Sequence, residues 1–157
     1  MAVDPEFIAA VASSNVCALY YALCEEYPLR LRIPRTTLAK TAVLEAAAAR
    51  ELPLEKLRGP GAVYRLSSLP ENLSLNVIIQ GGGSLETDFT VHYRDRPQRD
   101  GFAQLCYSAR IFTGQPPCQP PYPRPTCLSV DEILPVIKRL DDLTRILGSF
   151  SGRPSTC

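Results

Sequence analysis

The sequence predicts an α+β fold in which an antiparallel meander sheet of four to five strands packs against two N-terminal helices and one C-terminal helix. Three observations lead to this prediction. Apolar residues recur at helical spacing near both ends of the chain, they recur at every second residue in between, and prolines or glycines mark the changes. The length of 157 residues suits one domain, which we place at residues 8–147.

Residues 8–26 are predicted to form the first helix, because apolar side chains recur every three or four positions until Pro28. The helix is apolar around most of its circumference, which is typical of a helix that is buried on several sides or shared with a partner. We therefore predict a helix interface, with a homodimer as its corollary, at Val16, Leu19, Tyr20 and Leu23.

Residues 29–33 alternate apolar and basic side chains, which favours a short strand with one wet face. Residues 35–51 are predicted to form the second helix, because their run of alanines has the highest helix propensity and Thr36 or Thr37 can cap the start. Pro53 ends this helix, and the Gly59-Pro60-Gly61 sequence marks a turn.

From residue 62 onward, apolar side chains recur at every second position instead of at helical spacing. Strands are predicted at residues 62–67, 73–80, 87–94 and 102–112, with a glycine-rich hairpin connection at 81–84 and a polar turn at 96–101. Short links between consecutive strands favour an antiparallel meander with one buried and one wet face.

Residues 113–126 form the least ordinary segment, because six of the ten residues from Pro116 to Pro125 are proline. Proline removes backbone donors, so this segment is predicted to be extended rather than helical. It serves either as a rigid connector or as a docking surface that loses little entropy on binding. The candidate partner-binding residues are Pro120, Pro121, Tyr122, Pro123 and Arg124.

The last helix is predicted at residues 129–147. Ser129 and Glu132 match the capping box, and Gly148 is a natural stop. Pro135 is expected either to kink this helix or to mark the start of its regular part. Residues 148–157 form a polar tail, and residues 1–7 resemble a cloning remnant that we set aside from the fold.

The cysteines, six in number, are expected to be free thiols rather than disulfides. Cys17 and Cys24 fall on one face of the first helix, and Cys106 falls in a predicted strand. Cys118 and Cys127 are the pair that we expect if any bridge forms. No cysteine or histidine spacing matches a zinc site, so we predict no metal and no cofactor, and we expect an intracellular protein, cytoplasmic or nuclear.

Charge and hydropathy exclude several classes of partner. The net charge is +1, which argues against a protein built mainly to bind nucleic acid, and no apolar run is long enough to span a membrane. Two small arginine groups nevertheless occur, and we keep a weakly basic nucleic-acid adaptor as an alternative. They are Arg30, Arg32 and Arg35, and Arg94, Arg96 and Arg99.

A second alternative is a small cysteine-dependent hydrolase. His92 is the single histidine, and Cys106 would lie on the adjacent predicted strand with a similar outward phase. No other catalytic arrangement stands out. We therefore predict a non-enzymatic protein–protein interaction module, an adaptor or scaffold domain that binds another protein and that could belong to a larger protein or complex.

The order of helix, meander, proline-rich crossing with Pro121-Tyr122-Pro123 and final helix resembles the non-catalytic ubiquitin-conjugating-like folds, the RWD and UEV domains. The resemblance covers residues 62–147. It implies a Tyr-Pro turn after the sheet. It implies no conjugating activity, because no His-Pro-Asn sequence precedes a candidate cysteine.

Overall fold

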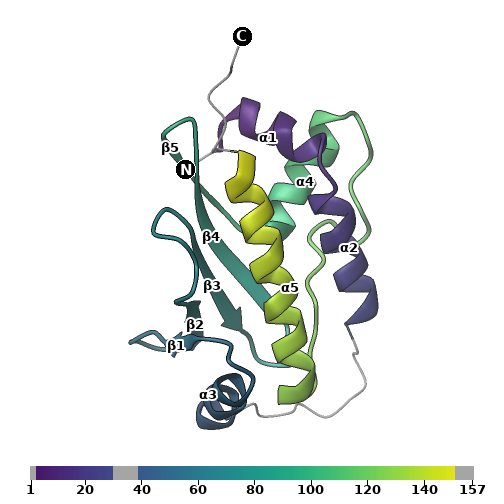
Figure 1. The fold of residues 1–157 in the computed structure, drawn as a ribbon. Helices are drawn as coiled ribbons and strands as arrows, with labels where there is room; N and C mark the ends of the chain where they lie inside the picture. The colour runs from purple at the N-terminus through teal and green to yellow at the C-terminus, as the bar shows by residue number, and fades with distance from the viewer. Residues whose placement is uncertain (1–2, 30–38, 151–157) are drawn as a thin grey trace.

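The computed structural model describes residues 3–29 and 39–150, and Figure 1 shows their arrangement. The helices are α1 (Pro5–Ala12), α2 (Val16–Glu26), α3 (Lys40–Ala49), α4 (Phe102–Phe112) and α5 (Val130–Ser149). The strands are β1 (Leu54–Lys56), β2 (Ala62–Leu66), β3 (Ser74–Ile79), β4 (Leu85–Tyr93) and β5 (Arg96–Asp100). The strands form one antiparallel sheet in the order β1-β2-β3-β4-β5, so the predicted α+β class and meander are confirmed.

The centre of the meander follows the sequence pattern closely. β3 and β4 pair in register from Ser74 opposite Thr90 to Ile79 opposite Leu85, and the predicted glycine-rich connection joins them. Alternate side chains of both strands are fully buried on one face, as the period of two requires. These side chains are Leu75 and Val77 of β3, and Leu85, Phe89 and Val91 of β4.

The segment after β4 differs from the prediction. The predicted turn over residues 96–101 is mostly strand β5, and the actual turn is the Arg94-Asp95 pair, whose φ angles are 52° and 63°. A two-residue hairpin of this kind usually contains glycine, so its sequence signal is absent here.

The predicted strand over residues 102–112 is also wrong, because this segment is helix α4. Its buried residues include Phe102, Leu105, Cys106 and Ala109, which follow a helical period. Along the chain, helix α4 follows the sheet and precedes the proline-rich segment. The element order that gave the resemblance to ubiquitin-conjugating-like folds is therefore not the order observed.

The predicted first helix is broken in two. Helices α1 and α2 meet at a bend of 66°. At the bend Ser14 Oγ donates to the carbonyl of Val11 at 2.6 Å and accepts from the amide of Val16 at 3.2 Å. The hydroxyl thus replaces helical hydrogen bonds at this point. No single helix of the described residues passes the length and hydropathy test for a membrane span, although the bent pair α1–α2 passes it together.

The other helix predictions hold with adjusted limits. The second predicted helix is α3, while its first residues and the strand predicted at 29–33 fall outside the described part of the chain, apart from Leu29 and Ala39. The capping box of the last helix is confirmed, since the Glu132 amide donates to Ser129 Oγ at 3.3 Å. Helix α5 continues through Pro135, which lies in its second turn.

Residues 4–7, set aside above as a cloning remnant, take part in the fold. Phe7 is fully buried, and its ring makes edge contacts with Tyr93 and Phe150 at centroid distances of 5.7 and 6.5 Å. The amide of Asp4 donates to Gln98 Oε1 at 2.8 Å. Residues 4–7, although set aside from the fold at first, therefore take part in its packing.

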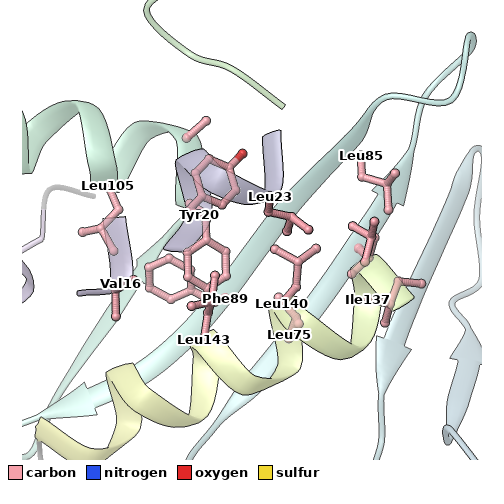
Figure 2. Close-up of a cluster of buried hydrophobic side chains, with 14 of the residues drawn as sticks. Val16, Tyr20, Leu23, Leu75, Leu85, Phe89, Leu105, Ile137, Leu140 and Leu143 are labelled. Atoms are coloured by element: carbon pink, nitrogen blue, oxygen red, sulfur yellow. The ribbon is translucent and has the colours of Figure 1, made fainter. Parts of the chain in front are cut away.

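The core lies between the sheet and the helices. Figure 2 shows side chains of α2, α4 and α5 meeting those of β3 and β4, with Tyr20 and Phe89 among the largest. Helix α5 crosses the sheet face, α2 packs against both α4 and α5, and α3 lies at the β1 edge (Figure 1). This arrangement places α2 and α4 side by side next to the proline-rich segment.

Candidate functional site

The proline-rich segment between α4 and α5 is extended, as predicted, and its two halves differ. We call residues 114–122 the outer half and residues 123–127 the inner half. The inner half is fixed to the fold by four hydrogen bonds. These run from Tyr20 Oη to the Pro123 carbonyl (2.8 Å), from the Leu85 amide to the Pro125 carbonyl (2.9 Å), from the Thr126 amide to the Tyr27 carbonyl (2.8 Å) and from the Cys127 amide to the Gly83 carbonyl (2.9 Å).

Arg124, one of the predicted partner-binding residues, is engaged within the chain. Its guanidinium contacts the Glu86 carboxylate at 2.6 Å, and both side chains are only 30% exposed. Arg124 therefore holds the inner half against β4. The other predicted residues are more open, since Pro120 and Tyr122 are exposed and Pro121 and Pro123 are half-buried.

A groove of about 460 Å³ separates α2 from the proline-rich segment. Apolar and aromatic side chains make up most of its walls, and they include three of the predicted residues. The residues that matter here are Tyr21, Leu29, Cys118, Pro120, Tyr122 and Pro123. Four of the five predicted docking residues thus line a groove whose opposite wall is α2, and the fifth, Pro121, does not line it.

Two of the exposed apolar side chains, Tyr122 and Leu29, line this groove. Tyr122 is 42% exposed, and its ring packs on Tyr107 of α4 with the centroids 4.8 Å apart. Leu29 is exposed at the opposite wall, while Ile111 and Phe112, exposed at the end of α4, are not among the residues that line the groove. Such grouping on a surface is typical of an interaction site.

The predicted helix interface is mostly internal. Val16, Tyr20 and Leu23 are at most 1% exposed and belong to the core, which accounts for the apolar circumference of the helix. Leu19 is 40% exposed and faces a pocket of about 160 Å³ between α2 and α5. Of the four predicted residues, Leu19 is the one that lies on the surface of this chain.

A cluster of thiols lies behind the groove. Cys17, Cys24, Cys106 and Cys118 are free, so the bridge considered between Cys118 and Cys127 is not formed. The Cys106 thiol donates a hydrogen bond to Cys17, which lowers the pKa of Cys17 despite partial burial, and the Arg110 guanidinium lowers it further. Burial raises the pKa of Cys24 to about 12.

This thiol cluster is not predicted from the sequence pattern. Cys106 and Arg110 are one helical turn apart, but the strand prediction for residues 102–112 put them on the same side of a sheet instead of facing α2. The helical period of the buried residues would have revealed the cluster.

The geometry assumed for a cysteine hydrolase is not present. Cys106 lies in α4, where it is fully buried, and not on a strand beside β4. The His92 ring instead makes a hydrogen bond through Nδ1 with the Asn72 carbonyl at 3.0 Å. The adjacency predicted for His92 and Cys106 is therefore wrong.

The second arginine group is paired with carboxylates. Arg94 contacts Glu6 at 2.5 Å, Arg96 contacts Asp4 at 3.6 Å, and Arg99 contacts Asp88 at 2.8 Å. These pairs reduce the positive field that a nucleic-acid backbone would need. The first group, Arg30, Arg32 and Arg35, lies outside the described residues.

Metal ligation finds no support in the part of the chain that the structure describes. No group of three or more His, Cys, Asp and Glu side chains there is arranged to hold a metal ion. No family model, curated protein or solved structure matches the chain.

Proposed function

We propose that this chain is a non-enzymatic protein-interaction module, and that its partner docks in the groove between α2 and the outer half of the proline-rich segment. The observation that supports this proposal most directly is that two exposed apolar side chains, Leu29 and Tyr122, line the groove. Exposed apolar groups of this size gain free energy when a partner removes them from water.

The groove is already formed before a partner arrives. The inner half holds the prolines in place through its hydrogen bonds and the Arg124–Glu86 pair. Proline also restricts the backbone of the outer half. Docking would therefore fix few additional rotatable bonds of this chain, which reduces the entropic cost of binding.

The chemistry of the walls favours an extended apolar segment of another protein as the occupant. Arg124 is neutralised by Glu86, so the groove offers Glu25 as its remaining charged side chain among the described lining residues. Proline offers ring faces and carbonyl oxygens but no amide donors, so the partner would supply apolar side chains and backbone N–H groups.

The test compares two exposed apolar residues of matched exposure on different surfaces. Tyr122→Ala changes the groove, and Leu19→Ala changes the α2–α5 pocket; the two side chains are 42% and 40% exposed. Each site also receives a photo-crosslinking amino acid. We expect one protein to crosslink in stoichiometric yield at position 122, and its capture to fall at least tenfold in Tyr122→Ala and not in Leu19→Ala.

The opposite pattern would place the partner on the α2–α5 pocket and contradict docking at the groove. Absence of any stoichiometric crosslink at both sites would contradict the interaction-module proposal itself. Sedimentation of the pure protein covers the case of a second copy. If the pure protein is a dimer and Tyr122→Ala dissociates it, the occupant of the groove is a second copy of this chain and not another protein.

A further inference from the structure

Two cysteines face each other across the packed helices α2 and α4. Cys17 lies in the first turn of α2, and Cys106 lies in the middle of α4. The Cys106 thiol lies close enough to Cys17 to lower the pKa of Cys17 as a hydrogen-bond donor, and both cysteines are free. A thiol at such proximity is placed to attack a derivative formed on its neighbour.

The next helical turn adds a cation to this pair. Tyr21 follows Cys17 by one turn of α2, and Arg110 follows Cys106 by one turn of α4. The Arg110 guanidinium carbon lies 5.8 Å from the centre of the Tyr21 ring. Two residues of α2 therefore face two residues of α4, and the positive charge lies beside Cys17.

Three influences favour the thiolate form of Cys17. The hydrogen bond from Cys106 has the largest effect on its pKa, and the Arg110 charge lowers this pKa further against the opposing effect of burial. The position in the first turn of α2 adds the positive end of the helix dipole. The thiolate is the nucleophilic form of cysteine.

The two cysteines differ in access. Cys17 is half-buried and reaches solvent, whereas Cys106 is fully buried. The hydrogen bond to Cys17 and burial raise the pKa of Cys106 well above its usual value. One reactive thiol with a protected thiol beside it is the arrangement found in redox-sensing cysteines.

We propose that Cys17 is a peroxide-reactive thiol and that Cys106 resolves its oxidised form as a disulfide between α2 and α4. The Cys17 thiolate attacks one oxygen of hydrogen peroxide, the O–O bond breaks, and the hydroxide that leaves takes up a proton to become water. Cys17 is then a sulfenic acid. The Cys106 sulfur attacks it, an S–S bond forms, and a second water leaves with the hydroxyl of the sulfenic acid and the proton of Cys106.

The neighbouring thiols make a selective reaction expected. Cys24 lies two turns from Cys17 on the same face of α2, but burial keeps its pKa at about 12 and its thiol protonated. Cys118 lies beside the Tyr21 hydroxyl in the proline-rich segment. This inference does not depend on the docking proposal, since it concerns the helix contact behind the groove.

The first test uses the unaltered protein. Reduced protein is treated with one equivalent of hydrogen peroxide and analysed by intact mass and by peptide mapping without reductant. We expect a product lighter by two hydrogen atoms, with the peptides of Cys17 and Cys106 joined. A disulfide between other cysteines, or oxidation that leaves Cys17 unmodified, would overturn the proposal.

Variants then separate the two roles. Cys106→Ser should stop at the sulfenic acid, which dimedone traps on Cys17, and Cys17→Ser should give neither product. Cys24→Ser is the matched control on α2 and should still form the disulfide. Trapping of a sulfenic acid on Cys106 in the Cys17→Ser protein would contradict the assignment.

A pH profile gives a readout that does not depend on cysteine variants. Because the thiolate reacts, iodoacetamide should alkylate Cys17 with a midpoint below the ordinary thiol pKa of about 8.5. Arg110→Gln should raise this midpoint and slow the peroxide reaction at pH 7 by a factor of about three, which corresponds to half a pKa unit. A midpoint at or above the ordinary value in the unaltered protein would also overturn the proposal.

Discussion

The two halves of the proline-rich segment differ in what surrounds them. The outer half is largely exposed and contacts α4 through the Tyr122 ring and through Arg110 Nε, which donates to the Pro116 carbonyl at 2.7 Å. The inner half lies against α2, β4 and the β3–β4 connection, where Pro125, Thr126 and Cys127 are buried. Proline residues thus lie mainly on the surface in the outer half and pack against the fold in the inner half. The difference comes from their neighbours, because α2, β4 and the β3–β4 connection cover the inner half.

The largest effect is expected at Gly83, where the inner half meets the hairpin. Its φ is +88°, and an added Cβ would lie 1.9 Å from the Cys127 carbonyl oxygen. Gly83→Ala should therefore lower the free energy of unfolding by about 3 kcal/mol or more, measured by urea denaturation.

Gly82→Ala is the matched control for this substitution. Gly82 has a similar φ of +91° but open space around the added Cβ. We expect a loss of about 1–2 kcal/mol from backbone strain alone. Equal losses in the two variants would show that the close approach to Cys127 contributes nothing.

Tyr20→Phe tests the hydrogen bond at the start of the inner half. Tyr20 is 1% exposed, and its hydroxyl donates to the Pro123 carbonyl at 2.8 Å. Removal leaves a partly buried carbonyl without this donor and should cost about 1–2 kcal/mol in the free energy of unfolding. An unchanged denaturation midpoint would mean that water satisfies the carbonyl equally well.

Arg124→Gln removes the ion pair with Glu86. Both side chains are 30% exposed, so we expect a loss of about 1 kcal/mol, near the upper end for surface pairs. Dissolved salt screens ion pairs that are partly exposed to solvent. The difference in unfolding free energy between the variant and the unaltered protein should therefore shrink as the salt concentration rises, and a constant difference would contradict an electrostatic origin.

The smallest stability effect is expected in the outer half. Tyr122→Ala loses the packing on Tyr107, which should cost about 0.5 kcal/mol, the lower end for aromatic pairs, because the ring is 42% exposed. A loss as large as that of Tyr20→Phe would remove the distinction between the two halves. Thermal denaturation of the variants side by side provides the comparison.

The sequence correctly predicts those parts of the fold whose local pattern is compatible with only one type of secondary structure. β3 and β4 alternate over most of their length and are joined by a glycine-rich connection, and Ser129 with Glu132 marks the start of α5. Residues 102–112 fit both periods, since Ala103, Leu105 and Ala109 belong to either stripe. Packing of Phe102 and Cys106 against α2 decides for the helix, and that packing is not visible in a local pattern.

The candidate site likewise has features that the local sequence predicts and features that it does not. Exposure of Pro120 and Tyr122 follows from composition, because an extended proline-rich chain has no partner strand to cover it. The internal roles of Arg124 and Tyr20 could not be predicted, because they depend on residues about 40 and 100 positions away. The proximity of Cys17 and Cys106 depends on helix α4, which the sequence pattern did not predict.

The contact between Phe7 and Phe150 brings the first and last described helices together, at the same end of the molecule in Figure 1. A short linker between Val3 and Phe150 would therefore cross little space, and new ends could be opened at the exposed turn of Gly59, Pro60 and Gly61. The fold is thus suited to circular permutation. It could also be inserted into a surface loop of a host protein, with both of its junctions leaving from one end.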